Sequence, residues 1–426
     1  MSRMTTSTLV GKNNWAFAEW VNRIPESEIR RLLKFSPKYY FAGGKPGILP
    51  VDIFHEIIAD IVAEEKSNPD VAIQNEYNYG VTSGNSDFRS VLQQRLQKND
   101  NIVVPTANDV VISTGSQQML FALNDVFINP GDPVLVSKPS YLGFLSSAEK
   151  FKAELITLPS DENGLIPEYI DTAMQLSKKK FGRYPKLLYT IPYSDNPSGT
   201  TMPESRKKAI IDISFNYNDL LVVEDVAYKE IRFNDRPITS MKHFDKENEK
   251  VAYLSTSSKE AAVFRVGYSV IPFDIKEAFV KIKGYYDLNT PEFTQKILTK
   301  YYTNYIDQVL PTIRKGYQER AEAIIKAIDQ FMPFGTYTKP EGGFFIWFEM
   351  LNKEFDSIKK ISEFVEKGVS YVPGKPFYPM KGNEITVDNK LQSLEVPSNT
   401  FRLGYSLMTP EKITEGIKLL GKLLQA

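Results

Sequence analysis

The run from Leu220 to Val223 constrains the fold of this chain more than any other stretch. It is wholly apolar, and it ends directly in two carboxylates, Glu224 and Asp225. Such a run fits a strand that is buried on both faces, as the strands of parallel sheets are. A carboxylate at the end of a buried strand is costly unless it meets a cation. The run therefore predicts both a parallel sheet and a charged partner at its edge.

Other apolar runs have the same form, and each leads into polar or aromatic residues. These runs are 110–113, 133–136, 187–191 and 251–254. The stretches between them, such as Met119 to Phe127, have apolar residues at helical spacing. Strands that alternate with helices from about 105 to 270 predict an α/β fold with a mostly parallel central sheet and helices on both faces. Sheets of this kind bind ligands at the carboxyl ends of their strands.

A chain of 426 residues is too long for one simple core, so we expect more than one domain. We expect an N-terminal arm over 1–50 that joins a smaller α+β domain over 306–426, and a large domain over 51–305. Further expectations concern single elements: helices over 25–33, 51–64, 86–97 and 410–424, a helical stretch from Pro291 towards Phe331 that is interrupted near Pro311, an aromatic strand over 344–348, and a polar loop over 381–399.

Composition excludes several kinds of chemistry. The chain has no cysteine and only two histidines, which argues against disulfides, thiolate nucleophiles, metal sites and a serine-histidine triad. Its 52 basic and 52 acidic residues cancel, so the charge suggests neither nucleic acid nor an anionic membrane as a partner. No run approaches the roughly 20 apolar residues that span a bilayer. We expect a cytoplasmic protein without a metal ion.

The stretch that follows the run 251–254 has the residues of a reactive site. Four hydroxyl residues, Ser255 to Ser258, precede Lys259, and Arg265 follows six positions later. A lysine held near a second cation has a lowered pKa, and its neutral amine can form a Schiff base with an aldehyde. Hydroxyls and an arginine suit a phosphate. A solvated surface turn would show the same residues, so the segment alone does not decide.

Several other residues at strand ends have both a functional and a plain structural interpretation. The strand 110–113 runs into Gly115, Ser116 and Gln117, a turn that presents backbone N–H groups to an anion at a helix N-terminus but also recurs in many folds. The remaining candidates could equally be turn, core or surface residues: Gly43 and Gly44 in a tight turn, Tyr79, Tyr141, Asn196, Tyr228 and Arg402. For Arg402 the alternatives are a two-pronged grip on a carboxylate and a surface edge position.

Taken in order, these motifs resemble the fold-type I pyridoxal-phosphate aminotransferases, class I/II, over essentially the whole chain. The chain is most similar to the branch that contains 2-aminoadipate and kynurenine aminotransferases. The motifs that carry this likeness are Ala-Gly-Gly-x-Pro at 42–46, Gly-Ser-Gln-Gln at 115–118 and Pro-Ser-Tyr-Leu-Gly at 139–143. The resemblance implies pyridoxal 5′-phosphate as cofactor, amino acids and 2-oxo acids as substrates, and a homodimer with shared active sites.

The resemblance also implies a role for each candidate. Lys259 would form the Schiff base and shuttle a proton, and Asp225 would hold the pyridine nitrogen. The other implied contacts are Asn196 and Tyr228 to the phenolic oxygen, Tyr141 stacked on the ring, Ser116, Gln117, Thr256, Ser258 and Arg265 at the phosphate, Tyr79 reaching the phosphate of the other subunit, Arg402 on the substrate α-carboxylate, and Gly43 and Gly44 beside the substrate.

One departure from the family pattern affects the reaction type. Arg265 follows Lys259 by six residues, where the family usually has seven or eight, so the loop must bend differently to reach the phosphate. Glu260 also puts a negative charge beside the amine. A pyridoxal-phosphate lyase, decarboxylase or oxidase on the same scaffold stays open, because a fold does not fix which bond breaks.

Two further classes are disfavoured. A non-catalytic sensor fused to a DNA-binding module does not suit the short N-terminal region or the intact Lys259. A nucleotide-binding protein is disfavoured because neither glycine-rich phosphate motif appears. For the aminotransferase, the aromatics Tyr141, Phe344 and Phe345 favour aromatic amino acids or 2-aminoadipate as donor, with 2-oxoglutarate as acceptor and a ping-pong mechanism.

Overall fold

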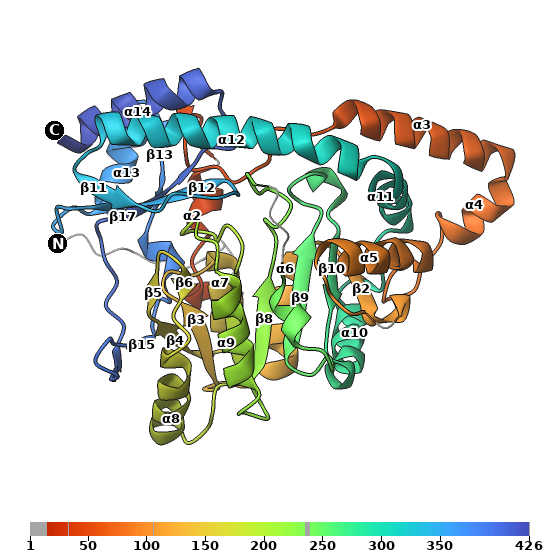
Figure 1. Ribbon diagram of the computed structural model, residues 1–426, viewed down its shortest axis with the longest axis horizontal. Helices are drawn as coiled ribbons and strands as arrows, with labels where there is room; N and C mark the ends of the chain where they lie inside the picture. Colours follow the sequence, from red (N-terminus) through yellow and green to blue (C-terminus); the bar gives the residue numbers. More distant parts are fainter. Residues whose placement is uncertain (1–14, 33, 105, 235–238, 426) are drawn as a thin grey trace.

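A nine-stranded sheet forms the centre of the computed structural model, which describes residues 15–32, 34–104, 106–234 and 239–425 (Figure 1). In order across the sheet the strands are β16 (Leu391–Ser393), β15 (Asn383–Ile385), β4 (Glu154–Leu158), β3 (Pro133–Ser137), β7 (Leu187–Thr190), β8 (Leu221–Asp225), β9 (Val251–Thr256), β10 (Gly267–Val270) and β2 (Val110–Ser113). The strands from β15 to β9 run parallel, whereas β16, β10 and β2 pair antiparallel. The predicted mostly parallel sheet is confirmed.

Helices cover both faces of this sheet because successive residues of a strand point to opposite sides. On β8, Leu221 and Val223 join the core beneath α6 (Ser116–Phe127), α7 (Leu142–Lys150) and α10 (Phe273–Asp287). Val222 faces α8 (Tyr169–Phe181) and α9 (Glu204–Ser214). At the β10 and β2 end, the second face is covered by α3 (Val51–Ser67), α5 (Ser86–Asn99) and α11 (Glu292–Asn304).

A second, smaller sheet has the order β11 (Gly335–Tyr337), β12 (Phe345–Met350), β17 (Thr400–Gly404) and β14 (Val372–Pro373). The helix α12 (Ile306–Phe331) runs from the large sheet to this one and packs beside α14 (Pro410–Gln425), as Figure 1 shows along the top of the molecule. The helix α13 (Ser357–Glu366) packs there too, and β1 (Tyr39–Tyr40) pairs with β13 (Val369–Ser370). The domain limits at 50/51 and 305/306 stay a prediction.

The remaining elements are short. They are α1 (Glu19–Arg23), α2 (Glu28–Leu32), α4 (Pro69–Asn75), the β5 (Ser160–Asp161) and β6 (Gly164–Leu165) hairpin, and the 3-10 turns η1 (Ala107–Asp109), η2 (Met241–Phe244), η3 (Ala262–Phe264) and η4 (Lys375–Phe377). The predicted helix over 25–33 corresponds to α2, and Leu33 lies outside the described residues. Among the helices that the structure describes, none is both long and apolar enough to cross a bilayer.

Two predictions about single elements are wrong. The polar stretch 381–399 is not all loop, because it contains β15 and β16 at the edge of the large sheet. Within the two strands, only Ile385 and Leu391 bring apolar side chains to the core, so the stretch has no strand-like hydrophobic pattern. The helix is not interrupted at Pro311, which lies inside α12; the break falls at Tyr305. The buried face of α12 offsets the one hydrogen bond that a proline removes.

Candidate active site

A cavity of about 220 Å³ lies where the parallel strands of the large sheet end, and most of the predicted site residues line it. Its lining consists of Gly43, Gly44, Lys45, Ser116, Tyr141, Ile191, Asn196, Asp225, Ala227, Tyr228, Lys259, Phe345 and Arg402. A larger cavity of about 590 Å³ meets it at Ile191 but is lined by neither Lys259 nor Arg402. The reactive groups therefore gather in the smaller cavity.

Lys259 lies just beyond β9, as predicted, and its Nζ is 4.5 Å from the centre of the Tyr228 ring. Burial lowers the pKa of Lys259 to about 8. The carboxylates of Asp225 and Glu260 oppose this shift, whereas the positive charges of Arg265 and Arg402 add to it. A useful fraction of the amine is therefore neutral near neutral pH, which is the form that can react with an aldehyde.

Asp225 ends β8 and points its carboxylate into the cavity. One oxygen accepts a hydrogen bond from the Tyr189 hydroxyl at 3.0 Å, and the other accepts one from the Ala227 N–H at 3.2 Å. Burial raises the pKa of Asp225 to about 6. No ion pair among the described residues includes Asp225, so the protein supplies hydrogen bonds to this carboxylate but no direct cationic partner.

Its neighbour Glu224 points to the opposite face of the sheet, and both of its carboxylate oxygens accept hydrogen bonds. Its carboxylate accepts hydrogen bonds from the Ser240 hydroxyl at 2.5 Å and from the Met241 and Lys242 N–H groups at 2.7 and 3.0 Å. The two carboxylates predicted at the strand end thus have different surroundings. Only Asp225 has room for a ligand.

Arg402 is fully buried in β17 and aims its guanidinium at the cavity. It donates to the Asn196 side-chain oxygen at 2.7 Å and to the Ala42 carbonyl at 3.4 Å, and its guanidinium carbon lies 3.9 Å from the centre of the Phe345 ring. Its Nε has no partner although it is buried. Burial lowers the pKa of Arg402 to about 10. The surface edge interpretation of Arg402 is therefore wrong.

An anion cradle forms where the Arg265 loop meets the start of α6. Gly115, two residues after β2, is the N-cap of α6 and has φ +80°. The helix begins at Ser116 with no side-chain cap, so its first N–H groups are open to a ligand. A Cβ on Gly115 would lie 2.8 Å from Arg265 Nη2. Arg265 Nη1 donates to the Ser258 hydroxyl at 3.1 Å, and that hydroxyl lies 2.8 Å from the Thr256 hydroxyl. These are the groups that a phosphate needs.

The short Lys259-to-Arg265 loop reaches the cradle by an unusual bend. It passes through the single 3-10 turn η3, after which Arg265 adopts the left-handed conformation with φ +54°. This conformation is modestly unfavourable in free energy for a residue other than glycine. Arg265 therefore lies at the cradle although the spacing from Lys259 is shorter than usual.

Glu260 does not point at the amine of Lys259. Only 1% of its surface is exposed, and it accepts a hydrogen bond from the Tyr302 hydroxyl of α11 at 2.7 Å, while its second oxygen is buried without a partner. Burial raises the pKa of Glu260 to about 7. Its charge beside Lys259 is therefore partly neutralised at neutral pH.

Tyr79 and Gln117 lie outside the lining of the cavity, and their predicted contacts to the phosphate stay predictions. Tyr79 is 83% exposed and does not line the cavity of its own chain. The Gln117 side chain donates to the Gly143 carbonyl at 3.1 Å and accepts from the Tyr141 hydroxyl at 3.2 Å, so it holds Tyr141 at the cavity wall. Only its backbone N–H, in the first turn of α6, is placed for an anion.

Sequence reasoning missed Tyr189 and Lys45. Tyr189 lies inside an apolar strand, where nothing in the pattern marks it as the partner of Asp225. Lys45 stands next to the predicted glycines and lines the cavity. Phe345 also lines the cavity, whereas Phe344 packs behind it, with ring centres 4.7 Å from Tyr317 and 5.4 Å from Tyr228.

Comparison with known proteins identifies the class of site. Residues 52–420 match the family model for aminotransferases of class I and II. The chain is 35% identical to aromatic-amino-acid aminotransferase 1 of Thermococcus litoralis, over 96% of this chain and 94% of that protein.

Two solved structures are similar over nearly the whole chain. A kynurenine aminotransferase from Pyrococcus horikoshii, in complex with PMP, has a TM-score of 0.84 at 33% identity and covers 96% of each chain. An alpha-aminoadipate aminotransferase from Thermus thermophilus, complexed with N-(5′-phosphopyridoxyl)-L-leucine, has a TM-score of 0.81 at 29% identity and covers 96% of this chain and 97% of that one. Both bind a pyridoxyl group with a fold like this one.

Proposed function

This chain belongs to the class I and II aminotransferases, enzymes that use pyridoxal 5′-phosphate, and on that premise we propose its substrates and the order of its reaction. It moves the amino group of an aromatic or 2-aminoadipate-type L-amino acid to a 2-oxo acid such as 2-oxoglutarate, by a ping-pong mechanism. The observation that carries this proposal is that Lys259, Asp225 and Arg402 line one cavity.

The residues of the cavity fit the cofactor. The carboxylate of Asp225 is buried and has no ion pair within the described part of the chain, and a protonated pyridine nitrogen would supply the missing cation. The cradle of Ser116, Thr256, Ser258 and Arg265 offers hydroxyl, N–H and guanidinium donors to a phosphate. When bound, the cofactor supplies an electron sink that stabilises negative charge at the substrate Cα.

The chain's own residues hold the two ends of the site. We assign the phosphate to Ser116, Thr256, Ser258, Arg265 and the Gln117 N–H. Three further residues complete the cofactor contacts: Tyr141 at the ring face, and Asn196 and Tyr228 at the phenolic oxygen. Burial raises the pKa of the Tyr228 hydroxyl, so this group keeps its proton and acts as a donor.

Arg402 is placed to bind the α-carboxylate of the substrate. Its guanidinium is pinned by Asn196 and packed against Phe345, so it presents a fixed two-pronged donor to an incoming carboxylate. The buried Nε still lacks a partner. Binding there holds the Cα–H bond near the Nζ of Lys259, which takes the proton as a base in its neutral form.

Tyr79 supports a homodimer as the working form. Its ring is exposed and does not line the cavity of its own chain, as expected of a side chain that completes the phosphate site of a second copy. A cytoplasmic location stays a prediction.

The first test is the visible spectrum of the cofactor-loaded protein during anaerobic titration with single amino acids. We expect an aromatic amino acid or 2-aminoadipate to convert the aldehyde form of the cofactor to its amine form, and 2-oxoglutarate to reverse the change. Lys259→Ala should abolish it, because it removes the buried amine whose pKa is lowered towards neutrality. Lys98→Ala, at an exposed lysine of α5, is the control and should behave as the wild type.

Other outcomes contradict parts of the proposal. Release of carbon dioxide, or turnover only when oxygen is admitted, moves the protein to a decarboxylase or oxidase on the same scaffold. Reaction with small aliphatic amino acids and with neither proposed class overturns the substrate assignment.

A further inference from the structure

We propose that Lys45 recognises the far carboxylate of a dicarboxylic substrate, either an acidic amino acid or the corresponding 2-oxo acid. The assignment rests on the proposed function, because it takes the α-carboxylate to lie on Arg402 and the amino group to lie at Lys259. It adds a specificity-determining residue to that site.

The first step is that the backbone around Lys45 is fixed. The Ser406 hydroxyl donates to the Lys45 carbonyl at 2.6 Å, and the N–H groups of Gly47 and Ile48 donate to the Tyr317 hydroxyl at 2.9 and 3.1 Å. The turn is thus held at Lys45 and just after it by groups from other parts of the chain. Its side chain starts from a defined point at the cavity wall.

The second step is the closeness of this turn to the substrate-binding arginine. A Cβ on Gly44 would lie 3.0 Å from Phe345 Cζ and 3.9 Å from Arg402 Nη2. A Cβ on Gly43 would lie 2.7 Å from a methyl carbon of Leu407. The two glycines let the turn lie against the cavity. Lys45 directly follows Gly44, which lies beside the guanidinium of Arg402.

The third step is charge. The cationic side chains that line the cavity are Lys45, Lys259 and Arg402. The reaction occupies Lys259, and the α-carboxylate occupies Arg402. Lys45 is exposed at the cavity, and no hydrogen bond or ion pair among the described residues engages its amine. Asp225, the one acidic residue in the lining, is assigned to the cofactor. The positive charge of Lys45 is therefore free for a ligand.

The fourth step is the chemistry of the remaining wall. Tyr141, Ile191 and Phe345 offer apolar and aromatic surface to a substrate side chain. The amine of Lys45 adds an anchor for a carboxylate at the end of that side chain, while its methylene stem can lie against a flat ring. One cavity can then accept aromatic and dicarboxylic substrates in turn, which a transaminase that pairs the two classes requires.

The test compares substrate classes in the holoenzyme. Lys45→Met should lower kcat/KM for L-glutamate and L-2-aminoadipate about tenfold or more, mainly through KM, because a charge-assisted hydrogen bond is lost. L-Phenylalanine should change less than twofold. Lys45→Arg should restore most of the loss, and Lys98→Met, which removes a lysine charge from exposed α5, should leave both classes unchanged. An equal fall for both classes, or no fall in either, overturns the proposal.

A binding measurement separates this inference from the proposed function. Glutarate and 3-phenylpropionate cannot react, but both carry a carboxylate that can occupy Arg402. We expect Lys45→Met to weaken glutarate binding to the holoenzyme about tenfold and to leave 3-phenylpropionate unchanged. A wild-type enzyme that transaminates aromatic amino acids but binds glutarate no better than the variant overturns the role of Lys45 alone. Glutarate binding that depends on Lys45, in a protein inactive with every proposed amino acid, overturns the proposed function alone.

Discussion

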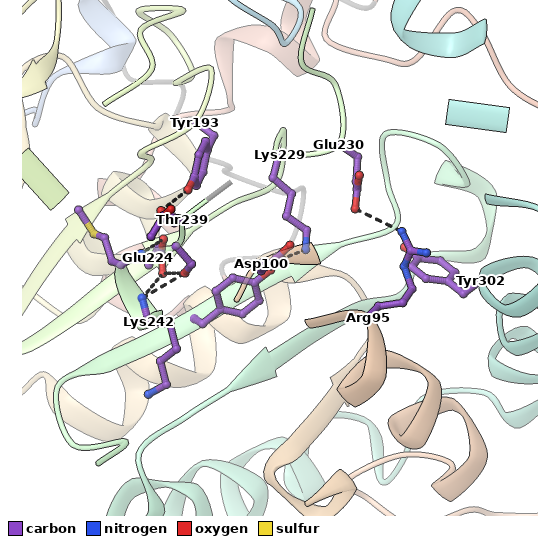
Figure 2. A network of polar contacts seen from close by, with 12 residues as sticks. Arg95, Asp100, Tyr193, Glu224, Lys229, Glu230, Thr239, Lys242 and Tyr302 are labelled. Atoms are coloured by element: carbon purple, nitrogen blue, oxygen red, sulfur yellow. Dashed lines mark hydrogen bonds and ion pairs between the residues drawn. The ribbon is translucent and has the colours of Figure 1, made fainter. Parts of the chain in front are cut away.

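The cavity and a second group of polar residues contain the same kinds of side chain, but buried charge is paired in one and unpaired in the other. We call the second group the network; its labelled members in Figure 2 are Arg95, Asp100, Tyr193, Glu224, Lys229, Glu230, Thr239, Lys242 and Tyr302. In the network, Lys229 pairs with Asp100 (Figure 2). Asp100 also accepts a hydrogen bond from the Tyr253 hydroxyl at 2.6 Å. In the cavity, no cation of the described residues forms an ion pair with Asp225, and the buried Nε of Arg402 finds no hydrogen-bond partner among them. Paired charge stabilises a fold, whereas unpaired buried charge is costly unless a ligand completes it.

The two regions meet along one short segment, where neighbouring residues alternate between them. Asp225 and Tyr228 line the cavity, whereas Glu224 and Lys229 belong to the network. Burial alone would lower the pKa of Lys229, but the Asp100 carboxylate more than offsets this and holds that pKa above its usual range. Because these residues are adjacent in the chain, the contacts of Glu224 hold the backbone next to Asp225, and those of Lys229 hold the backbone next to Tyr228.

The largest effect should come from breaking the network. Lys229→Met leaves Asp100 as an unpaired buried carboxylate, so we expect the free energy of unfolding to fall by about 3 to 5 kcal/mol. Denaturant unfolding of the holoenzyme measures this change.

The double variant Lys229→Met, Asp100→Leu is the control for that experiment. It removes both charges, and we expect it to recover most of the lost stability. A single variant as stable as the wild type would contradict the view that the pair is fully buried and coupled.

The same change made in the cavity should lower activity and leave stability intact. Asp225→Asn keeps the shape of the side chain but removes the charge that meets the pyridine nitrogen. We expect kcat to fall about 10²- to 10³-fold, as it does when one preorganised electrostatic contact is removed. The free energy of unfolding of the apoprotein should stay the same or rise, because no cation is left unpaired. A loss of stability as large as that of Lys229→Met would erase the contrast between the two regions.

The sequence predicts one side of this contrast much better than the other. Asp225, Asn196 and Lys259 each follow an apolar run, and parallel strands bring the ends of such runs together, so local pattern places them in one site. Lys229 and Asp100 are separated by 129 positions, and no local pattern marks them as partners. Tyr189 is hidden for a similar reason, because inside a strand it looks like a core residue. The strands β15 and β16 were missed because each has three residues, two of them polar, which is too short for a strand-like alternation to show.

The smallest effect that we predict concerns Glu260, which shares features of both regions. Its carboxyl is buried like a network residue and accepts a hydrogen bond from Tyr302, but its second oxygen has no partner, like the groups of the cavity. Burial raises the pKa of Glu260 to about 7, so the group is mostly neutral below that pH and mostly charged above it.

The charge of Glu260 opposes the lowering of the Lys259 pKa to about 8. At pH 7 a lysine with a pKa of 8 is neutral in roughly one molecule in ten, against roughly one in 3000 for an ordinary lysine. The rate at which the apoprotein captures pyridoxal phosphate should therefore rise through about pH 8. Glu260→Gln removes a negative charge that favours the ammonium form, so the midpoint of this rise should move to lower pH by a few tenths to about one unit.

The titration of Glu260 itself sharpens this prediction. Well below pH 7 the wild-type carboxyl is already neutral, so the capture rates of the wild type and Glu260→Gln should converge there. Between pH 7 and 8 the wild-type carboxylate is charged and the variant should be faster. Stopped-flow absorbance over pH 5.5 to 9.5 measures both regions. The control is Glu277→Gln, which removes the same charge from an exposed position on α10. A midpoint that moves to higher pH, or a rate difference that persists unchanged at pH 5.5, would show that Glu260 acts on Lys259 through packing and not through charge.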